Sequence, residues 1–183
     1  MIPKYRPGAK GDPRPDRVVA RVCGYLKQRF GFHLGMNSIT PAERARRAAQ
    51  SMWDDDRAST WFGMHLAEIG EGSAVMVLTV QAHHCNGHGM CHGGVTYALA
   101  DSAFAFACNS RNQRTVAQQN SMTYVAAAWE GDILTARARE VSASGRSGIY
   151  DVKVTRQDGS VVAEFRGLCR AIKGQLFDEE GTP

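Results

Sequence analysis

The chain has 183 residues, 43% of them apolar, which is enough for one domain with a sizeable core and too short for two. The net charge of +4 is unevenly spread, because residues 1–50 hold 11 of the 22 Lys and Arg residues but only 3 of the 18 Asp and Glu residues. No segment approaches the roughly 20 apolar residues of a membrane span, and the N-terminus lacks the apolar stretch of a secretory signal. We therefore expect a cytoplasmic protein without a membrane partner.

Residues 1–40 are predicted to be a basic, partly ordered N-terminal extension, followed by a domain at 41–183. Within the extension, a helix is predicted over 17–30 from apolar residues at every fourth position: Val18, Val22, Leu26 and Phe30. A basic arm can contact nucleic acid, but the rest of the chain has no interleaved basic and aromatic residues. We therefore expect no nucleic-acid partner.

A second helix is predicted to begin in the stretch TPAERARRAAQSMW. Thr40 is a typical N-cap residue, Pro41 takes the first helical position, and Glu43 completes a capping box.

The remainder of the chain predicts one long helix and a series of strands. The Ala-rich stretch at 93–109 favours a helix with a thin profile. The segments with the β-branched content and alternation of strands are 73–82, 115–128, 132–143, 148–157 and 160–172. The order of short helices, a strand or two, one central helix and four consecutive antiparallel strands predicts an α+β fold in which a sheet wraps a single helix.

Asp101 is a lone carboxylate inside this central helix, in a stretch whose other residues are typical of a buried segment. An ionised carboxylate among Ala, Leu and Phe side chains is costly unless paired, so Asp101 lies either at the surface or in a functional site. Gly93 and Gly94 begin the helix, where unpaired N–H groups suit a carbonyl oxygen that becomes an oxyanion. The same glycines are also typical of a tight turn from strand to helix.

The segments NGHGMCHGGVTYALADSAFAFACNS and SGRSGIYDVKV resemble the hotdog-fold acyl-coenzyme-A thioesterases of the phenylacetic-acid-degradation type, over residues 41–173. The resemblance implies two chains with a continuous sheet, and dimers that associate into tetramers. It also implies hydrolysis of acyl-coenzyme-A thioesters with aromatic, phenylacetyl-type or medium-chain acyl groups. Coenzyme A is part of that substrate, and no separate cofactor is implied.

The resemblance assigns roles to four residues around the start of the helix. The Gly93 N–H would hold the thioester carbonyl, and Asp101 would act as the general base or attack the thioester itself. Asn86 would orient water or the carbonyl, and His92 would support the oxyanion loop. From the residues alone, Asn86-Gly87 is equally typical of a turn and His92 of a structural histidine.

Arg146 and Ser147 lie in the loop that matches the coenzyme-contacting region of the family, and Gly94 would lie against the coenzyme A part of the substrate. As turn residues, Arg146 and Ser147 are also compatible with plain solvation.

Two alternatives stay open. Cys85, His88, Cys91 and His92 have the ligand types of a zinc site, but no second distant pair of ligands follows, so we expect no metal. A non-catalytic, regulatory protein that binds acyl-coenzyme A is the second alternative. The carboxylate of Asp101 argues against it, because a pure binder needs no desolvated carboxylate beside a carbonyl.

Overall fold

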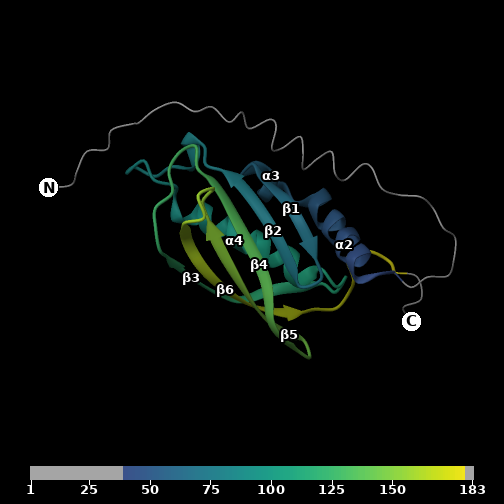
Figure 1. The fold of residues 1–183 in the computed structure, drawn as a ribbon. Coiled ribbons are helices and arrows are strands. Elements are labelled where there is room, and N and C mark those ends of the chain that lie inside the picture. The colour runs from purple at the N-terminus through teal and green to yellow at the C-terminus, as the bar shows by residue number, and fades with distance from the viewer. Residues whose placement is uncertain (1–38, 180–183) are drawn as a thin grey trace. The chain divides into compact units, whose positions relative to one another are not determined.

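The computed structural model describes residues 39–179, and the helix predicted over 17–30 lies outside them. The described helices are α2 (Pro41–Asp55), α3 (Arg57–Trp61), the short 3-10 helix η1 (Ala82–His84) and α4 (Gly93–Asn109). The strands are β1 (Met64–Gly70), β2 (Ser73–Thr79), β3 (Thr115–Tyr124), β4 (Ile133–Ser144), β5 (Ser147–Thr155) and β6 (Val161–Ala171) (Figure 1). Within residues 39–179, no helix is both long and apolar enough to cross a membrane.

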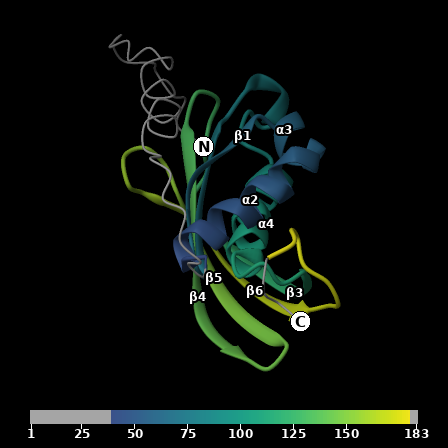
Figure 2. The same ribbon diagram turned by 90° about the vertical axis from the view of Figure 1, so that its right-hand side faces the viewer.

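The strands form one antiparallel sheet in the order β1-β2-β4-β5-β6-β3. Figures 1 and 2 show this sheet curving around α4, with α2 beside the same helix, which confirms the predicted α+β layout. Of the four strands after α4, β4, β5 and β6 are neighbours in chain order, but β3 pairs with β6 instead of β4. The connection at 125–132 is longer than a tight hairpin turn and carries the chain across the sheet to pair β4 with β2.

The two edge strands depart most from the sequence-based expectation. No separate range was predicted for β1, and its weak alternation explains why, since only Met64 among its residues is fully buried. The strand predicted over 115–128 ends at Tyr124, at the other edge of the sheet.

Small side chains let α4 lie close to the sheet. Ala100, Ala103 and Ala107 are fully buried. On the sheet side, a Cβ added to Gly167 of β6 would lie 2.8 Å from the Phe104 ring, so only a glycine leaves room for this ring. Phe104 also packs against Phe165, with ring centroids 5.8 Å apart. The small side chains predicted for the helix are therefore matched by a glycine on the sheet, and the two elements can pack closely together.

The helix predicted at Thr40 begins there. The Thr40 hydroxyl accepts a hydrogen bond from the Glu43 N–H at 3.2 Å, and Pro41 is the first helical residue. The Glu43 carboxylate accepts a hydrogen bond from Arg46 at 3.1 Å. The half of the capping box made by Thr40 is thus confirmed.

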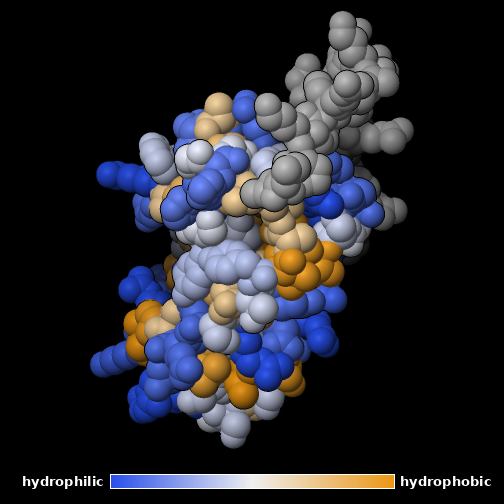
Figure 3. All heavy atoms as spheres, turned by 90° about the vertical axis from the view of Figure 1, so that its left-hand side faces the viewer, coloured by the Kyte–Doolittle hydropathy of each residue, from blue (hydrophilic) through white to orange (hydrophobic). Residues whose placement is uncertain are grey.

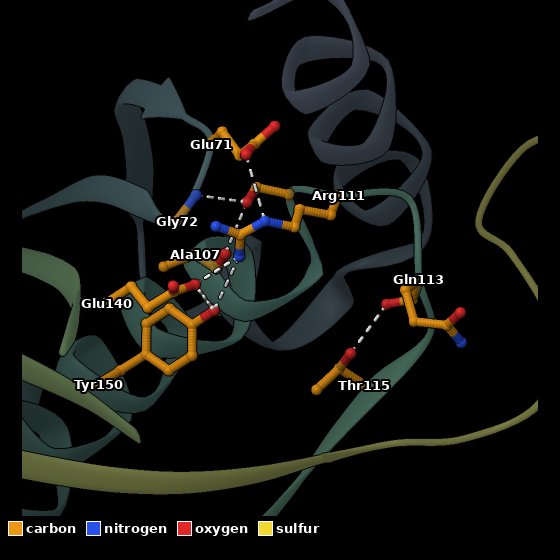
Figure 4. Close-up of polar contacts among 9 residues, drawn as sticks. Glu71, Gly72, Ala107, Arg111, Gln113, Thr115, Glu140 and Tyr150 are labelled. Atoms are coloured by element: carbon orange, nitrogen blue, oxygen red, sulfur yellow. Dashed lines mark hydrogen bonds and ion pairs between the residues drawn. The ribbon is translucent and has the colours of Figure 1, made fainter. Parts of the chain in front are cut away.

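A polar network secures the C-terminal end of α4 (Figure 4). Arg111 pairs with Glu140 on β4 and with Glu71 in the turn between β1 and β2, the latter at 3.3 Å. The Tyr150 hydroxyl donates to the same Glu140 carboxylate at 2.8 Å. Burial alone would raise the pKa of Glu140, but the hydrogen bonds from Arg111 and Tyr150 lower it. These contacts hold the end of α4 that lies away from Gly93.

The segment after β6 returns to α2. Arg44 of α2 donates two hydrogen bonds of 3.0 Å from Nε and one of 2.6 Å from Nη2 to the Glu179 carboxylate. The Asn112 side chain accepts hydrogen bonds from the N–H groups of Leu176 and Phe177, both at 3.1 Å. The first helix and the last residues of the described chain therefore lie side by side.

Candidate active site

The first turn of α4 leaves one backbone donor free. His92 is the N-cap residue, and its Nδ1 accepts a hydrogen bond from the Gly94 N–H at 2.9 Å. The next two N–H groups, of Val95 and Thr96, donate to the His92 carbonyl. Across residues 39–179 the Gly93 N–H meets no acceptor. His92 therefore caps the start of α4, and the Gly93 N–H has no acceptor among the described residues.

Tyr124, at the end of β3, covers Gly93. Its hydroxyl donates to the Gly93 carbonyl at 2.9 Å, and a Cβ at position 93 would lie 3.1 Å from its ring. Tyr124 was not predicted as a site residue, because its contact with Gly93 depends on how β3 crosses the helix.

Asp101 lies two turns further along α4 and is half-buried. Its Oδ1 accepts a hydrogen bond from Nδ2 of Asn120, on β3, at 2.8 Å. Burial raises the pKa of the Asp101 carboxyl above its ordinary value of 3.8, and the bond from Asn120 acts in the opposite direction. Its second oxygen, Oδ2, has no hydrogen-bond partner among the described residues. The carboxylate therefore keeps one oxygen open to a reactant.

Asn86 forms a turn, as one of the two interpretations of Asn86-Gly87 predicted. Its Oδ1 accepts hydrogen bonds from the N–H groups of His88, at 2.9 Å, and Met90, at 3.3 Å. The turn returns the chain so that Cys85 and Cys91 form an antiparallel bridge just before α4. With the side-chain oxygen engaged in this turn, the side-chain NH₂ group is the part of Asn86 that remains for orienting water or substrate.

Arg146 and Ser147 lie in the turn from β4 to β5, away from Gly93 within one chain. Ser147 begins β5, and its neighbour Gly148 packs against Cys169, whose thiol contacts Cys108 near the end of α4. The single chain therefore places the predicted coenzyme-contacting turn at the opposite end of α4 from the predicted oxyanion donor.

A cavity of about 410 Å³ opens beside the first turn of α4. Its lining residues are Trp61, Phe62, His83, His84, Cys85, His92, Gly94 and Val95. Trp61 and Phe62 come from the end of α3 and were not predicted, because a short amphipathic stretch gives no sign of which cavity it borders. The cavity offers an apolar and aromatic lining next to the free N–H.

His84 is the buried histidine among the residues that line this cavity. Nδ1 of His84 accepts a hydrogen bond from the Gln81 N–H at 3.0 Å, and burial lowers the pKa of this histidine. Within residues 39–179, no group of three or more His, Cys, Asp or Glu side chains is arranged so that it could hold a metal ion.

Comparison with known proteins identifies the family. A model of the thioesterase superfamily matches residues 88–163. The chain is 36% identical over 138 residues to the acyl-coenzyme A thioesterase PaaI of Escherichia coli strain K12, a match that covers 75% of this chain and 99% of that protein. The chain belongs to the thioesterase superfamily.

Solved structures of this superfamily agree with the fold. The structure of the E. coli PaaI protein from the phenylacetic acid degradation operon matches with a TM-score of 0.73 at 35% identity, over 74% of this chain and 99% of that one. A mutant of the phenylacetic acid degradation protein PaaI from Thermus thermophilus matches with a TM-score of 0.62 at 38% identity, over 64% of this chain and all of that one. The sheet that wraps α4 is therefore the hotdog fold of the thioesterase superfamily.

Proposed function

We propose that this chain hydrolyses acyl-coenzyme-A thioesters to the free acid and coenzyme A. The observation that carries the proposal is the combination on α4 of a free backbone N–H at Gly93 and a half-buried carboxylate at Asp101. The similarity to the acyl-coenzyme A thioesterase PaaI supports it independently.

The reaction follows from these two groups. The Gly93 N–H donates to the thioester carbonyl oxygen, and the partial positive charge of the helix N-terminus stabilises the oxyanion. Ionised Asp101 either removes a proton from the attacking water or adds to the carbonyl carbon itself. In both routes the tetrahedral intermediate expels the thiolate of coenzyme A, and the acyl group ends as a carboxylic acid. Because a thiolate is a good leaving group, neither a strong acid nor an added cofactor is required.

Each active site combines two chains. Gly93 and Asp101 are eight residues apart, which separates them by about 12 Å along the helix axis. A donor about 3 Å from the carbonyl oxygen and a base beside the same carbon must lie closer together than this. A homodimer with two-fold symmetry brings Gly93 of one chain to Asp101 of the other and creates two equivalent sites.

The edge strand β3 supplies the means of pairing. β3 has β6 on one side and no strand on the other among the described residues. It holds Gly93 through Tyr124 and Asp101 through Asn120, four residues earlier. Two β3 edges paired antiparallel, with Asn120 opposite Tyr124 of the partner subunit, place the two reactive groups across from each other.

The surface is compatible with such pairing. Figure 3 shows groups of apolar residues among hydrophilic ones on the left-hand face of Figure 1. Three large apolar side chains of β3 and the segment after it are about half exposed: Tyr124 at 53%, Val125 at 59% and Trp129 at 49%. Their burial between two chains would contribute to a stable dimer, and such dimers would associate further into tetramers.

The cavity beside α4 suits the acyl group. Its aromatic lining favours an aromatic, phenylacetyl-type or medium-chain acyl group, next to the carbonyl held at Gly93. Because the α4 helices of the two chains run antiparallel, Arg146 and Ser147 of the partner subunit come to the Gly93 end. There they can contact the phosphate groups of coenzyme A, while Gly94 lets the ligand approach the backbone closely. We place this activity in the cytoplasm, without a membrane or nucleic-acid partner.

The decisive test is release of coenzyme A from a panel of acyl esters, corrected for the cysteine thiols of the protein. Asp101→Asn keeps the size of the side chain and removes its charge, so we expect kcat to fall by about 100-fold or more with ester affinity little changed. Asp55→Asn, at an exposed position of α2, is the matched control and should leave turnover unchanged. Binding of esters without any turnover by the wild-type protein would instead support the non-catalytic, regulatory alternative.

A further inference from the structure

Asn120 connects the edge of the sheet to the proposed reactive carboxylate. It lies on β3, 19 residues after Asp101, and its Nδ2 is 2.8 Å from Asp101 Oδ1. A carboxylate only accepts hydrogen bonds, so the amide nitrogen and not the amide oxygen must face it. We propose that Asn120 is a positioning residue that holds the Asp101 carboxylate ionised and turned so that Oδ2 faces the reactant. This proposal rests on the proposed function of the site.

The packing of the fold does not by itself explain why residue 120 is an asparagine. Oδ1 of Asn120 is buried and has no hydrogen-bond partner within residues 39–179. A buried acceptor left without a partner costs on the order of 1–3 kcal/mol. On the opposite strand, Asn120 pairs with Gly167, which has no side chain that could satisfy it. The contact with Asp101 is therefore what the side chain of Asn120 provides to the structure.

The groups around Asp101 indicate that Asn120 is the residue that favours its charged form. Burial disfavours the charged form of Asp101, and within the described residues the Asn120 amide is the group that opposes this effect. The charged neighbours on β6, Glu164 and Arg166, pair in register with Thr123 and Ser121, whose side chains point to the other face of β3. Arg166 is bound to Asp151 there, at 2.7 Å, and Glu164 to Lys153, at 3.2 Å.

The hydrogen bond from Asn120 also gives the two oxygens of the Asp101 carboxylate different roles. The bond to Asn120 fixes Oδ1, so the carboxylate cannot rotate freely about its last side-chain torsion. Oδ2 is the oxygen left to accept a proton or to attack. A carboxylate without this bond would be both harder to ionise and less well oriented.

The test is the pH dependence of kcat and kcat/KM for three variants. Asn120→Ala removes the hydrogen bond, and Asn120→Asp keeps the shape while replacing the donor with a second carboxyl group. Asn120→Ala should move the acid limb of the pH–rate profile to higher pH. Asn120→Asp should instead split that limb into two steps, because two adjacent carboxyl groups titrate as a pair. We also expect kcat at pH 7 to fall about tenfold or more, with a small change in KM. Ser121→Ala, on the opposite face of the same strand, should leave the profile unchanged.

A purely structural role for Asn120 gives a different result. If both Asn120 variants fold and keep the wild-type acid limb while Asp101→Asn is inactive, the positioning role is wrong and the proposed function stands. If the wild-type protein shows no turnover, the proposed function fails. Carbon-13 NMR titration of Asp101 then still tests the positioning role without activity. A higher pKa of Asp101 in Asn120→Ala supports the role, and an unchanged pKa overturns it.

Discussion

The burial of the Asp101 carboxyl affects how the stability of the fold depends on pH. Burial raises the pKa of this carboxyl above its ordinary value of 3.8 in the folded chain. A carboxyl with a raised folded pKa contributes stability while it is protonated, below its ordinary pKa, and this contribution is lost as the pH rises through the folded pKa. At neutral pH the ionised side chain is therefore a cost to folding.

We predict that Asp101→Asn melts at a higher temperature than the wild-type protein at pH 7. The amide carries no charge to desolvate and still accepts the hydrogen bond from Asn120. The difference in Tm should shrink as the pH falls, and it should vanish below pH 3.8, where the wild-type carboxyl is protonated as well. Thermal unfolding at several pH values measures it, with Asp55→Asn as the control. A variant that melts below the wild type at neutral pH would contradict this account of Asp101.

The residues of the site differ in how far the sequence could predict them. Asp101 stands out because a carboxylate interrupts an apolar helix, and Gly93 because two glycines begin that helix. Asn120 lies among the polar residues AQQNS of an edge strand, which are typical of ordinary surface. Its importance depends on the contact with Asp101, and that contact arises only when β3 is placed against α4.

At the scale of elements, the packing of α4 on β6 depends on Gly167. A methyl group there would lie 2.8 Å from the Phe104 ring, and this ring is itself held by Phe165. We predict that Gly167→Ala destabilises the fold by about 1–3 kcal/mol, as overpacking of a core does. Urea unfolding measures the loss. Gly87→Ala, where a Cβ meets open space, is the matched control and should stay within about 0.5 kcal/mol of the wild type.

The elements themselves were largely predictable from local pattern, and their order in the sheet was not. The helix at 93–109 agrees with α4 in both bounds, and each predicted strand corresponds to an observed one. The position of β3 beside β6 depends on which strands can cover α4 together, and no local alternation contains that information. β1 was not predicted for a related reason. An edge strand buries so few of its side chains that its apolar and polar residues do not alternate clearly.

At the scale of the whole molecule, the two-chain site predicts complementation between inactive variants. Gly93→Pro removes the N–H that would bind the carbonyl, and Asp101→Asn removes the carboxylate. Mixed dimers of the two would hold one doubly damaged site and one intact site, so activity should return to as much as half of the wild-type value per mixed dimer. Two different affinity tags allow mixed dimers to be purified and assayed.

The control for this experiment is Gly93→Ala. It places a similar Cβ against Tyr124 but keeps the N–H, so it separates crowding from the loss of the donor. Folded parents and confirmed mixed dimers without any activity would mean that Gly93 and Asp101 act within one chain.

The contact between α2 and the last described residues has a consequence for the connectivity of the domain. Arg44 and Glu179 join the two ends of the described chain, so along its backbone the domain is almost a closed ring. A short linker between these ends would let the chain be reopened elsewhere, for instance at Gly145 in the turn from β4 to β5, without breaking a strand. Such a circular permutant would place both new termini beside Arg146, where a reporter group attached to a terminus would sit next to the proposed contact with coenzyme A.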